Sequence, residues 1–367
     1  MTFAILSMGT AQPSTTITQT DALHIARSLC CRTEEQATWL PALYDQSGID
    51  TRRLALGEDV VKDILEGTRH SGSPFLPRGT PDDCGPTTGQ RMAHYAELAP
   101  PLAVRAAGLA LARSGLPPRE LTHLVTVSCT GFSAPGVDLA LIRGLDLAPT
   151  VQRTHVGYMG CHGAINGLRV ARAFAAEPRA RVLLCAVELC SLHYHYGWNP
   201  QKMVANALFA DGAAAVVGAP VGAVPAGAWQ VAAAGSCLIP GSADAMSWTV
   251  GDHGFEMALS KRVPGLIATH LRPWLEGWLA GQGVSLDGVG SWAVHPGGPR
   301  ILGAVEEGLG LPRGALDAAR AVFRECGNMS SPTVLFILDR LRTAGAARPC
   351  VLLAFGPGLV AEAALVR

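Results

Sequence analysis

Three polar side chains far apart in the chain are the strongest candidates for chemistry: Cys161, His295 and Asn328. Each lies in a glycine-containing junction after an apolar run: MGCHGAING, AVHPGGPRIL and ECGNMSSP. A thiol can act as a nucleophile, an imidazole as its base, and a carboxamide as a donor to a negative oxygen. Taken singly, each has an ordinary explanation as a buried cysteine, a core histidine or a helix-capping asparagine. Together they predict a nucleophilic active site.

The segment around Cys161 predicts a reactive thiol. A glycine precedes the cysteine, and residues 163–177 have the spacing of a helix. A thiolate at a helix N-terminus faces unpaired backbone N–H groups and the positive end of the helix dipole. Both lower the pKa of a thiol, so we expect a depressed pKa at this position.

Composition limits the class of protein. Of the 367 residues, 49% are hydrophobic and 16% are charged, which allows a large core and argues against disorder. The 29 basic residues balance the 29 acidic ones, so no nucleic-acid partner is indicated. The first residues lack the basic segment of a secretory signal, and no apolar run is long enough to span a bilayer. We therefore expect a cytoplasmic protein without a transmembrane segment.

Cysteine and histidine are frequent, but their spacing predicts no metal site. The ten cysteines include no CxxC pair, which argues against a zinc ribbon or a thioredoxin-like motif. They lie in apolar strands and in turns, so a disulfide scaffold is not expected. His193 and His195 in HYHYGW lack a third ligand at a useful spacing. We expect no metal ion.

Apolar runs and helical patterns alternate along the chain, which predicts an α/β fold with a mostly parallel, buried sheet. A Pro/Gly/Ala stretch at 219–227 has no periodicity, and similar elements precede and follow it. We expect two halves, 1–222 with the cysteine and 223–367 with the histidine and asparagine. Strands are expected at 122–131, 180–190, 212–220, 229–235, 291–298, 349–356 and 359–367, and helices at 102–115, 137–147, 163–177, 204–212, 263–281, 300–310, 313–326 and 331–344.

Eight motifs occur in the order found in type III polyketide synthases, the chalcone synthase superfamily of thiolase-fold condensing enzymes. They are MGTAQP, VSCTGFSAPGVD, MGCHGAINGL, ALFADGAAA, GFEMALSKRVPGLI, VHPGGPRIL, GNMSSPTVLFIL and AFGPG. The chain resembles this family along essentially its whole length. The resemblance implies a thiolase-like duplicated fold with α-β-α-β-α layers and a homodimer. It implies malonyl-CoA and an acyl-CoA starter as substrates, with no cofactor.

The resemblance also implies a role for each of the three polar residues. Cys161 corresponds to the nucleophile that holds the starter and the growing chain as thioesters. His295 and Asn328 correspond to the pair that donates to the enolate oxygen formed when malonyl thioester loses CO₂. Removing one such donor typically raises a barrier by about 3 kcal/mol. An imidazolium at His295 would also keep the Cys161 thiol ionised.

Further positions correspond to residues around the family's tunnel and cavity. Phe209 and Phe255 match two phenylalanines between the CoA tunnel and the cavity. Arg52 and Arg53 lie where the family meets the CoA phosphates. Ala354 stands where the family's cyclisation loop usually begins with glycine. The loop itself corresponds to Gly356, Pro357 and Gly358.

The substrate-facing positions depart from those of plant enzymes. Chalcone synthases carry threonine at Cys129, Cys190 and His193, and an inter-subunit methionine at Ala134. The segment SWTVGDHGFEM, with Trp248, is closer to bacterial alkylpyrone and alkylresorcinol synthases. Besides the two phenylalanines and the cyclisation loop named above, the residues expected to line the substrate are Cys129, Ala134, Cys190, His193, Met246, Trp248 and Ser330.

These departures favour a fatty acyl starter, extended by malonyl-CoA and cyclised to an alkylpyrone or alkylresorcinol. A malonyl-primed tetrahydroxynaphthalene synthase is the alternative, because VSCTGF and ELCSL are similar to that subgroup. A papain-like cysteine hydrolase shares the order Cys, His, Asn. That reading lacks the CGSCW context and a glutamine donor before the cysteine.

Overall fold

The apolar runs of the sequence form the strands of one mixed sheet. The computed structural model describes residues 2–224 and 226–367. Within them, the order across the large sheet is β11 (Ser291–Val294), β12 (Cys350–Gly356), β13 (Val360–Val366), β8 (Gln230–Leu238), β1 (Phe3–Ala11), β7 (Asp211–Pro220), β6 (Val182–Leu189), β4 (His123–Ser128) and β5 (Gln152–Gly157).

The prediction of a mostly parallel sheet is wrong. Strand β4 pairs in parallel with β5 and β6, and β11 pairs in parallel with β12. The other pairings of this sheet are antiparallel. A continuous apolar run indicates that a strand is covered on both faces, which is the usual sign of a parallel sheet. In this protein helices cover both faces of antiparallel strands as well. The apolar runs therefore do not indicate whether neighbouring strands are parallel or antiparallel.

The sheet consists of two halves with the same internal order. In the first half the order is β4-β6-β7-β1, and in the second it is β11-β12-β13-β8. Both begin with a parallel pair and continue with two antiparallel pairs. The halves are joined through β1 and β8, where Phe3 pairs with Val231 and Ala4 with Gln230. The expected duplication is confirmed.

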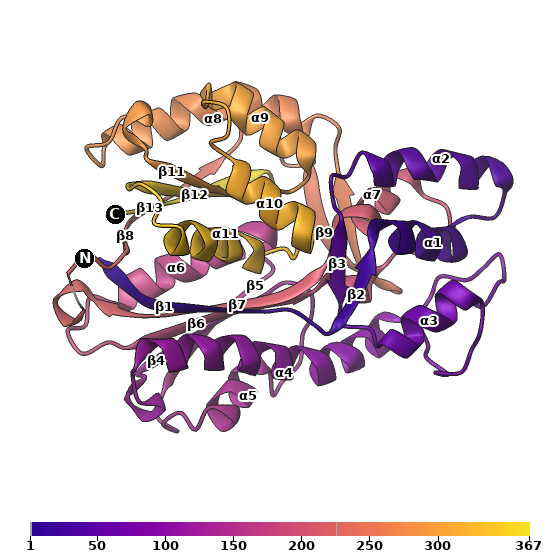
Figure 1. Cartoon of the computed structure of the whole chain (residues 1–367), viewed down its shortest axis with the longest axis horizontal. Coiled ribbons are helices and arrows are strands. Elements are labelled where there is room, and N and C mark those ends of the chain that lie inside the picture. The colour runs from indigo at the N-terminus through magenta and orange to yellow at the C-terminus, as the bar shows by residue number, and fades with distance from the viewer. Residues whose placement is uncertain (1, 225) are drawn as a thin grey trace.

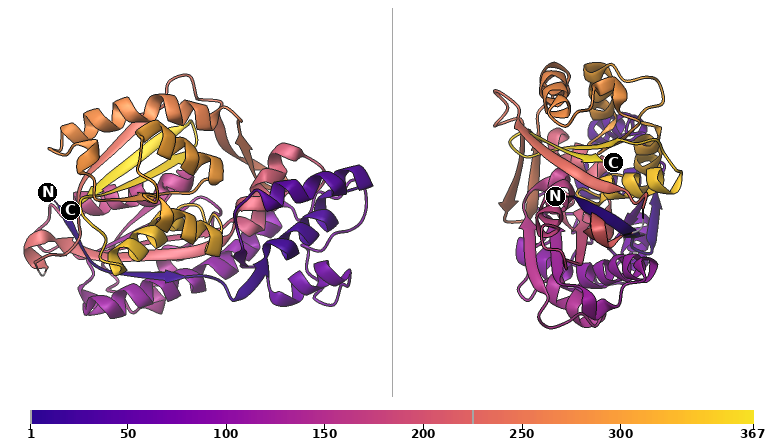
Figure 2. Two further views of the ribbon diagram at one scale, coloured as in Figure 1. Left: turned by 45° about the horizontal axis from the view of Figure 1, so that its top comes forward. Right: turned by 90° about the vertical axis from the view of Figure 1, so that its left-hand side faces the viewer.

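Helices form three layers around the two half-sheets (Figure 1). Helices α6 (Gly163–Phe174) and α11 (Pro332–Thr343) lie between the half-sheets and contact strands of both. Helices α4 (Thr88–Ser114) and α5 (Val137–Gly144) cover the first half-sheet, and α8 (Val263–Ala280) and α9 (Pro299–Leu309) cover the second. Figure 2 shows the same layers from two further sides, with both termini at one end. The α-β-α-β-α arrangement is confirmed.

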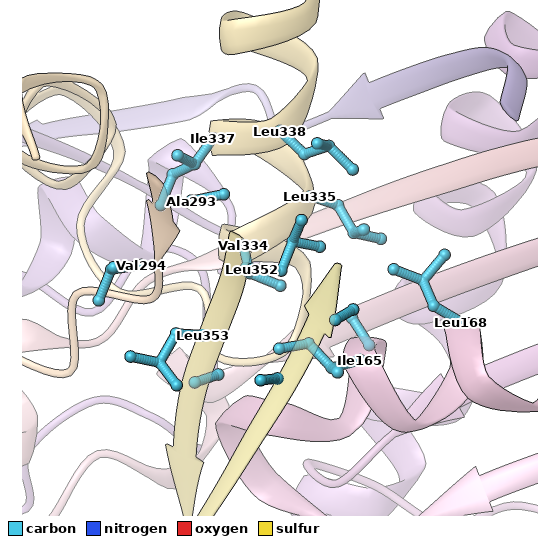
Figure 3. Close-up of a cluster of buried hydrophobic side chains, with 14 of the residues drawn as sticks. Ile165, Leu168, Ala293, Val294, Val334, Leu335, Ile337, Leu338, Leu352 and Leu353 are labelled. Carbon is cyan, nitrogen blue, oxygen red and sulfur yellow. The ribbon is translucent and has the colours of Figure 1, made fainter. Parts of the chain in front are cut away.

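The inner helices are held by apolar side chains on their sheet-facing sides. Figure 3 shows part of this core between α6, α11, β11 and β12. Full burial of a leucine, isoleucine or valine contributes about 1.5–3 kcal/mol, so this layer fixes the N-terminal ends of α6 and α11. The labelled residues are Ile165, Leu168, Ala293, Val294, Val334, Leu335, Ile337, Leu338, Leu352 and Leu353.

Further elements lie mainly at the end of the molecule opposite the termini (Figure 1). They include two small antiparallel sheets, β2 with β3 and β9 with β10. The bounds are β2 (Thr15–Thr18), α1 (Gln19–Cys30), α2 (Glu34–Asp45), β3 (Thr51–Leu54), α3 (Glu58–Glu66), α7 (Pro200–Leu208), β9 (Met246–Gly251), β10 (Gly254–Leu259) and α10 (Asp317–Cys326). Short 3₁₀ turns lie at η1 (Pro118–Glu120), η2 (Gly160–His162), η3 (Cys190–His193), η4 (Val221–Ala223) and η5 (Leu286–Gly288).

The chain crosses from one half-sheet to the other between β7 and β8. Strand β7 ends at Pro220 and β8 begins at Gln230. We propose that the halves divide in this crossing, at 222/223.

Across the described ranges, none of the helices is long and apolar enough to pass through a bilayer.

Candidate active site

The three polar residues come from equivalent places in the two halves. Cys161 lies in η2, which leads into α6, and Asn328 lies in the turn before α11. His295 directly follows β11. The helix N-termini and this strand end meet at one edge of the molecule's inner layer. As a result, the three side chains line a single cavity of about 30 Å³.

Asn328 is held by its backbone and by one side-chain oxygen. Its N–H donates to the Leu208 carbonyl at 2.9 Å, and its carbonyl accepts from the Ala210 N–H at 2.8 Å. Its Oδ1 accepts from the backbone N–H of Ser330 at 2.8 Å. These contacts are all that a helix-capping asparagine would need, and they leave the Nδ2 group unused. The Nδ2 hydrogens are then the part of Asn328 that can serve a ligand in the cavity.

His295 has a fixed backbone and an unpaired ring. Its N–H donates to the Leu353 carbonyl at 2.8 Å, while the residue is 1% exposed. Neither ring nitrogen has a hydrogen-bond partner among the residues that the structure describes. Burial, and to a smaller extent neighbouring His162, lowers the pKa of His295 to about 3. An unpartnered buried polar atom costs about 1–3 kcal/mol of folding stability. The His295 ring therefore does not stabilise the fold through hydrogen bonds, and its nitrogens are available to a bound reactant.

The expected depression of the Cys161 pKa is not produced by this geometry. Burial raises the pKa of the thiol to about 12, although the side chains of Ser330 and Asn328 act in the opposite direction. The loss of water around a thiolate outweighs the helix N-terminus. Burial therefore favours the neutral forms of both the Cys161 thiol and the His295 imidazole.

A second cavity of about 20 Å³ continues beyond Cys161. The Sγ atom of Cys129 and the Oγ atom of Ser330 are 3.5 Å apart, and the Trp248 indole N–H donates to the Cys129 carbonyl at 2.8 Å. The lining residues already expected from the sequence are Cys129, Cys161, Cys190, Phe209, Met246, Trp248, Ser330 and Pro357.

An aromatic wall separates this inner cavity from an outer cleft of about 310 Å³. His193 stacks on Phe255 with ring centroids 4.3 Å apart, and Trp248 packs edge-on against both rings. The Nδ1 atom of His193 accepts from the Phe255 N–H, and Nε2 lies 2.7 Å from the Thr130 carbonyl. Nε2 therefore carries the hydrogen, and both ring nitrogens are occupied.

Comparison with known proteins identifies the family. Residues 2–225 match the N-terminal domain of chalcone and stilbene synthases, and residues 230–367 match the C-terminal domain. The chain belongs to the chalcone and stilbene synthase family. It is a type III polyketide synthase, a condensing acyltransferase that uses malonyl-CoA and acyl-CoA thioesters and needs no other cofactor.

Three relatives illustrate the range of this family. The chain is 33% identical to 1,3,6,8-tetrahydroxynaphthalene synthase of Streptomyces peucetius over 99% of this chain and 93% of the relative. It is 32% identical to the alpha-pyrone synthesis polyketide synthase-like protein Pks18 of Mycobacterium tuberculosis over 98% of this chain and 90% of that one. The crystal structure of PKS-I from the brown alga Ectocarpus siliculosus has a TM-score of 0.91 at 33% identity, covering 100% and 99% of the two chains.

The two phenylalanines expected at the tunnel lie at different depths. Phe209 lines the outer cleft and both inner cavities, so it stands where all three meet. Phe255 lines only the outer cleft. Of the pair, Phe209 alone borders the space that contains Cys161.

The loop after β12 packs closely on the segment that carries the cysteine. A Cβ atom on Gly356 would lie 2.3 Å from Cδ2 of His162. Gly358 has φ +86°, in the left-handed region that favours glycine. Ala134 is exposed on a loop and does not line the inner cavities of its own chain.

The expectation that Arg52 contacts a CoA phosphate is wrong. Arg52 is 0% exposed, and its Nη1 atom donates to the carbonyls of Asn206 and Phe209 at 2.7 and 2.9 Å. Arg53, half-buried, donates to the Pro13 carbonyl at 3.3 Å. The alternation of strand β3 places Arg52 on the inner face beside Leu54. That signal was present in the sequence.

Sequence reasoning missed Glu188. This carboxylate is fully buried in β6 and accepts from the N–H groups of Cys129 and Thr130 and from the Ser331 hydroxyl at 2.6 Å. It ties the wall of the cavity to the start of α11. A glutamate inside the apolar run RVLLCAVELC was the available signal, since a buried charge requires several donors.

The candidate metal pair does not form a metal site. Both ring nitrogens of His193 are already hydrogen-bonded, as described above. In the parts of the chain that the structure describes, no group of three His, Cys, Asp or Glu side chains is arranged to hold a metal ion.

Proposed function

We propose that Cys161, His295 and Asn328 carry out decarboxylative condensation in this cavity. The observation that carries the proposal is a cavity where a thiol meets two further polar groups. They are the His295 ring, whose nitrogens have no hydrogen-bond partner among the described residues, and the Asn328 amide, whose oxygen is already paired with the Ser330 N–H. Nothing else in the lining of that space offers a nucleophile with two such partners.

The first half-reaction loads the starter. The Cys161 proton moves to His295. A lone thiolate would be unfavourable in this buried cavity, but attraction between the thiolate and the imidazolium offsets part of the desolvation cost. The thiolate attacks the acyl-CoA carbonyl, and the departing CoA thiolate takes the proton from His295. The products are acyl-Cys161 and free CoA.

The second half-reaction extends the chain. Malonyl-CoA loses CO₂, and the negative charge develops on the thioester oxygen of the enolate. An N–H of His295 and the Nδ2 hydrogens of Asn328 donate to that oxygen. The enolate carbon then attacks acyl-Cys161, releasing the Cys161 thiolate and a chain two carbons longer on CoA.

For the starter, we propose a fatty acyl chain and an alkylpyrone or alkylresorcinol product. The inner cavity alone has room for one or two water molecules. It shares Cys190, Phe209 and Trp248 with the 310 Å³ outer cleft. Displacement of these side chains would give an alkyl chain the volume that it needs.

A malonyl-primed tetrahydroxynaphthalene synthase is the second candidate. The small inner cavity favours it because a short starter requires less displacement of the aromatic wall than a fatty acyl chain does. Similarity to the Streptomyces peucetius enzyme supports it as well.

The test is a substrate panel analysed by mass spectrometry. The protein is incubated with ¹⁴C-malonyl-CoA alone, and then with octanoyl- to palmitoyl-CoA. The first proposal requires labelled lipophilic products whose mass follows the starter. Aromatic product from malonyl-CoA alone, unchanged by added acyl-CoA, would support the second candidate instead.

We also propose that the chain forms a homodimer through the face around β5. Strand β5 is an edge strand, and Phe132 and Tyr158 on neighbouring loops are 78% and 81% exposed. Exposed aromatic side chains beside an open sheet edge favour association. A cytoplasmic location remains a prediction from the sequence, which cell fractionation would test.

A further inference from the structure

Arg52 is a buried cation without a carboxylate partner. It lies in β3 with 0% exposure, and no ion pair in the described ranges includes it. Asp211, which is also fully buried, uses its oxygens on the Ser191 N–H and hydroxyl and on the Ala55 N–H. A buried charge is costly unless polar groups surround it. Burial raises the pKa of Asp211 and outweighs the Arg52 charge, which favours a lower pKa there. The hydrogen bonds of Arg52 go to the backbone carbonyls of Asn206 and Phe209.

Those carbonyls belong to the end of α7. Helix α7 ends at Leu208, with Phe209 as its C-cap. The Nη1 atom of Arg52 donates to the Asn206 carbonyl at 2.7 Å and to the Phe209 carbonyl at 2.9 Å. The last carbonyls of a helix have no partner within it and carry the negative end of its dipole. Arg52 supplies both a donor and a positive charge there.

The same end of α7 holds Asn328. Phe209 and Asn328 form an isolated parallel bridge. Its two hydrogen bonds run from the Asn328 N–H to the Leu208 carbonyl, and from the Ala210 N–H to the Asn328 carbonyl. The backbone that carries the Asn328 side chain is thus attached directly to the residue that Arg52 fixes.

Arg52 also touches the other side of this bridge. A Cβ atom on Gly327 would lie 2.9 Å from Arg52 Cγ, so the arginine stem packs against the residue before Asn328. The neighbouring Thr51 hydroxyl donates to the Glu325 carbonyl at 2.8 Å, at the end of α10. Gly327 has φ +69°, which suits glycine, and this turn leads directly to Asn328. One side chain therefore supports both strands of the bridge.

We propose that Arg52 is a positioning residue for Asn328: it holds the Phe209 carbonyl and the Gly327 turn so that the Asn328 amide stays aimed into the cavity. The inference rests on the proposed role of Asn328 in decarboxylation. Without Arg52 the Phe209 carbonyl loses its side-chain donor, the Asn206 carbonyl keeps the Tyr194 hydroxyl at 3.0 Å, and the bridge loses its support on both sides. The Asn328 amide then shifts relative to the enolate oxygen, while Cys161 on the opposite helix is unaffected.

The test is a double-mutant cycle on malonyl-CoA decarboxylation, with Arg52→Met, Asn328→Ala and the double variant. A displacement of about 1 Å can cost about 100-fold in rate, so we expect Arg52→Met to lower kcat by about 10- to 100-fold with KM nearly unchanged. In the Asn328→Ala background, Arg52→Met should lower kcat by less than about twofold. Independent, multiplying effects in the double variant would overturn the proposal.

Two controls separate positioning from general damage. Arg113→Met removes an arginine that likewise donates to a backbone carbonyl, that of Met8 at 2.9 Å, but lines none of the three cavities described above, and should leave kcat within about twofold. The rate of Cys161 alkylation by iodoacetamide should stay near the wild-type rate in Arg52→Met; a fall as large as that in kcat would contradict the proposal.

Arg52→Lys retains a charged donor and should restore most of the activity lost in Arg52→Met. If Arg52→Met does not fold, the same cycle is run with Arg52→Lys, whose smaller loss must again vanish in the Asn328→Ala background. A normal decarboxylation rate in Asn328→Ala alone would refute the proposed function instead. An effect of Asn328→Ala together with independent effects of Arg52 would refute only this inference.

Discussion

At the scale of single residues, His193 shows how the backbone fixes a protonation state. Its Nδ1 atom accepts the Phe255 N–H, so a proton on Nδ1 would break that bond. Burial lowers the pKa of His193 to about 4. An unfolded histidine has a pKa near 6.5, so on acidification the unfolded chain binds this proton first. The contribution of neutral His193 to stability is present above pH 6.5 and is lost as pH falls toward 4.

His193→Gln should therefore reduce the pH dependence of folding. Glutamine can donate and accept hydrogen bonds but does not titrate. Between pH 7 and pH 5 the wild type should lose about 2 kcal/mol more unfolding free energy than the variant. Urea unfolding at both pH values measures the difference. Equal losses in the two proteins would show that His193 is already charged, or that it is not buried.

The residue scale also shows where prediction from sequence ended. Cys161, His295 and Asn328 could be placed together because each follows a strand or precedes a helix at a glycine-marked turn. Residue type alone could not show which of Arg52 and Arg53 is buried. Only the alternation of side chains in the four-residue strand β3 distinguishes the buried arginine from its neighbour. The pKa of Cys161 depends on how completely the cavity excludes water, which no motif specifies.

At the scale of elements, the end of β12 sets the position of η2. Gly356 packs on His162, the residue after Cys161, and a Cβ there would also lie 2.8 Å from the Met159 carbonyl. Gly356→Ala should therefore shift η2, lower condensation activity and reduce stability by about 1–3 kcal/mol.

Gly303→Ala in α9 is the matched control, because a Cβ on Gly303 would meet nothing within 4 Å. Alanine in a helix should stabilise the protein by up to about 1 kcal/mol. Thermal unfolding and condensation assays on both variants make the comparison. A stable, fully active Gly356→Ala variant would mean that the loop does not position η2.

Element boundaries were predictable where one signal dominated. Residues 102–115 were expected to form a helix, but α4 begins at Thr88 and continues through Pro100 and Pro101. Proline inside a helix removes a backbone hydrogen bond, yet the helix continues through both prolines to the Thr87–Gln90 capping box at its start. Packing of α4 along the first half-sheet compensates for the hydrogen bonds that the prolines remove.

At the scale of the whole molecule, the repeated strand order explains why two helix N-termini and one strand end converge. Similar element order in the two halves suggested the duplication, and the layered fold follows from it. Strand direction did not follow, because helices bury both faces of every central strand. The partner of the exposed β5 edge, which we propose to be another copy of the chain, is likewise not specified by any motif within one chain.

The dimer proposal predicts twice the mass of one chain by light scattering at micromolar concentration. Phe132→Glu should shift the mass toward that of the monomer, because a charge replaces an exposed ring at the proposed interface. Leu65→Glu is the control, since Leu65 is 38% exposed on α3, outside the proposed face. A monomeric wild type would contradict the dimer itself. If the wild type and both variants are dimeric to the same extent, this face is not the interface.

The release of ¹⁴CO₂ from carboxyl-labelled malonyl-CoA tests the division of labour among the three polar residues most directly. The account predicts that Cys161→Ala still releases CO₂ but forms no polyketide, and that Asn328→Ala lowers CO₂ release by about 100-fold or more. Polyketide formation by Cys161→Ala, or CO₂ release within tenfold of the wild type by Asn328→Ala, would contradict it.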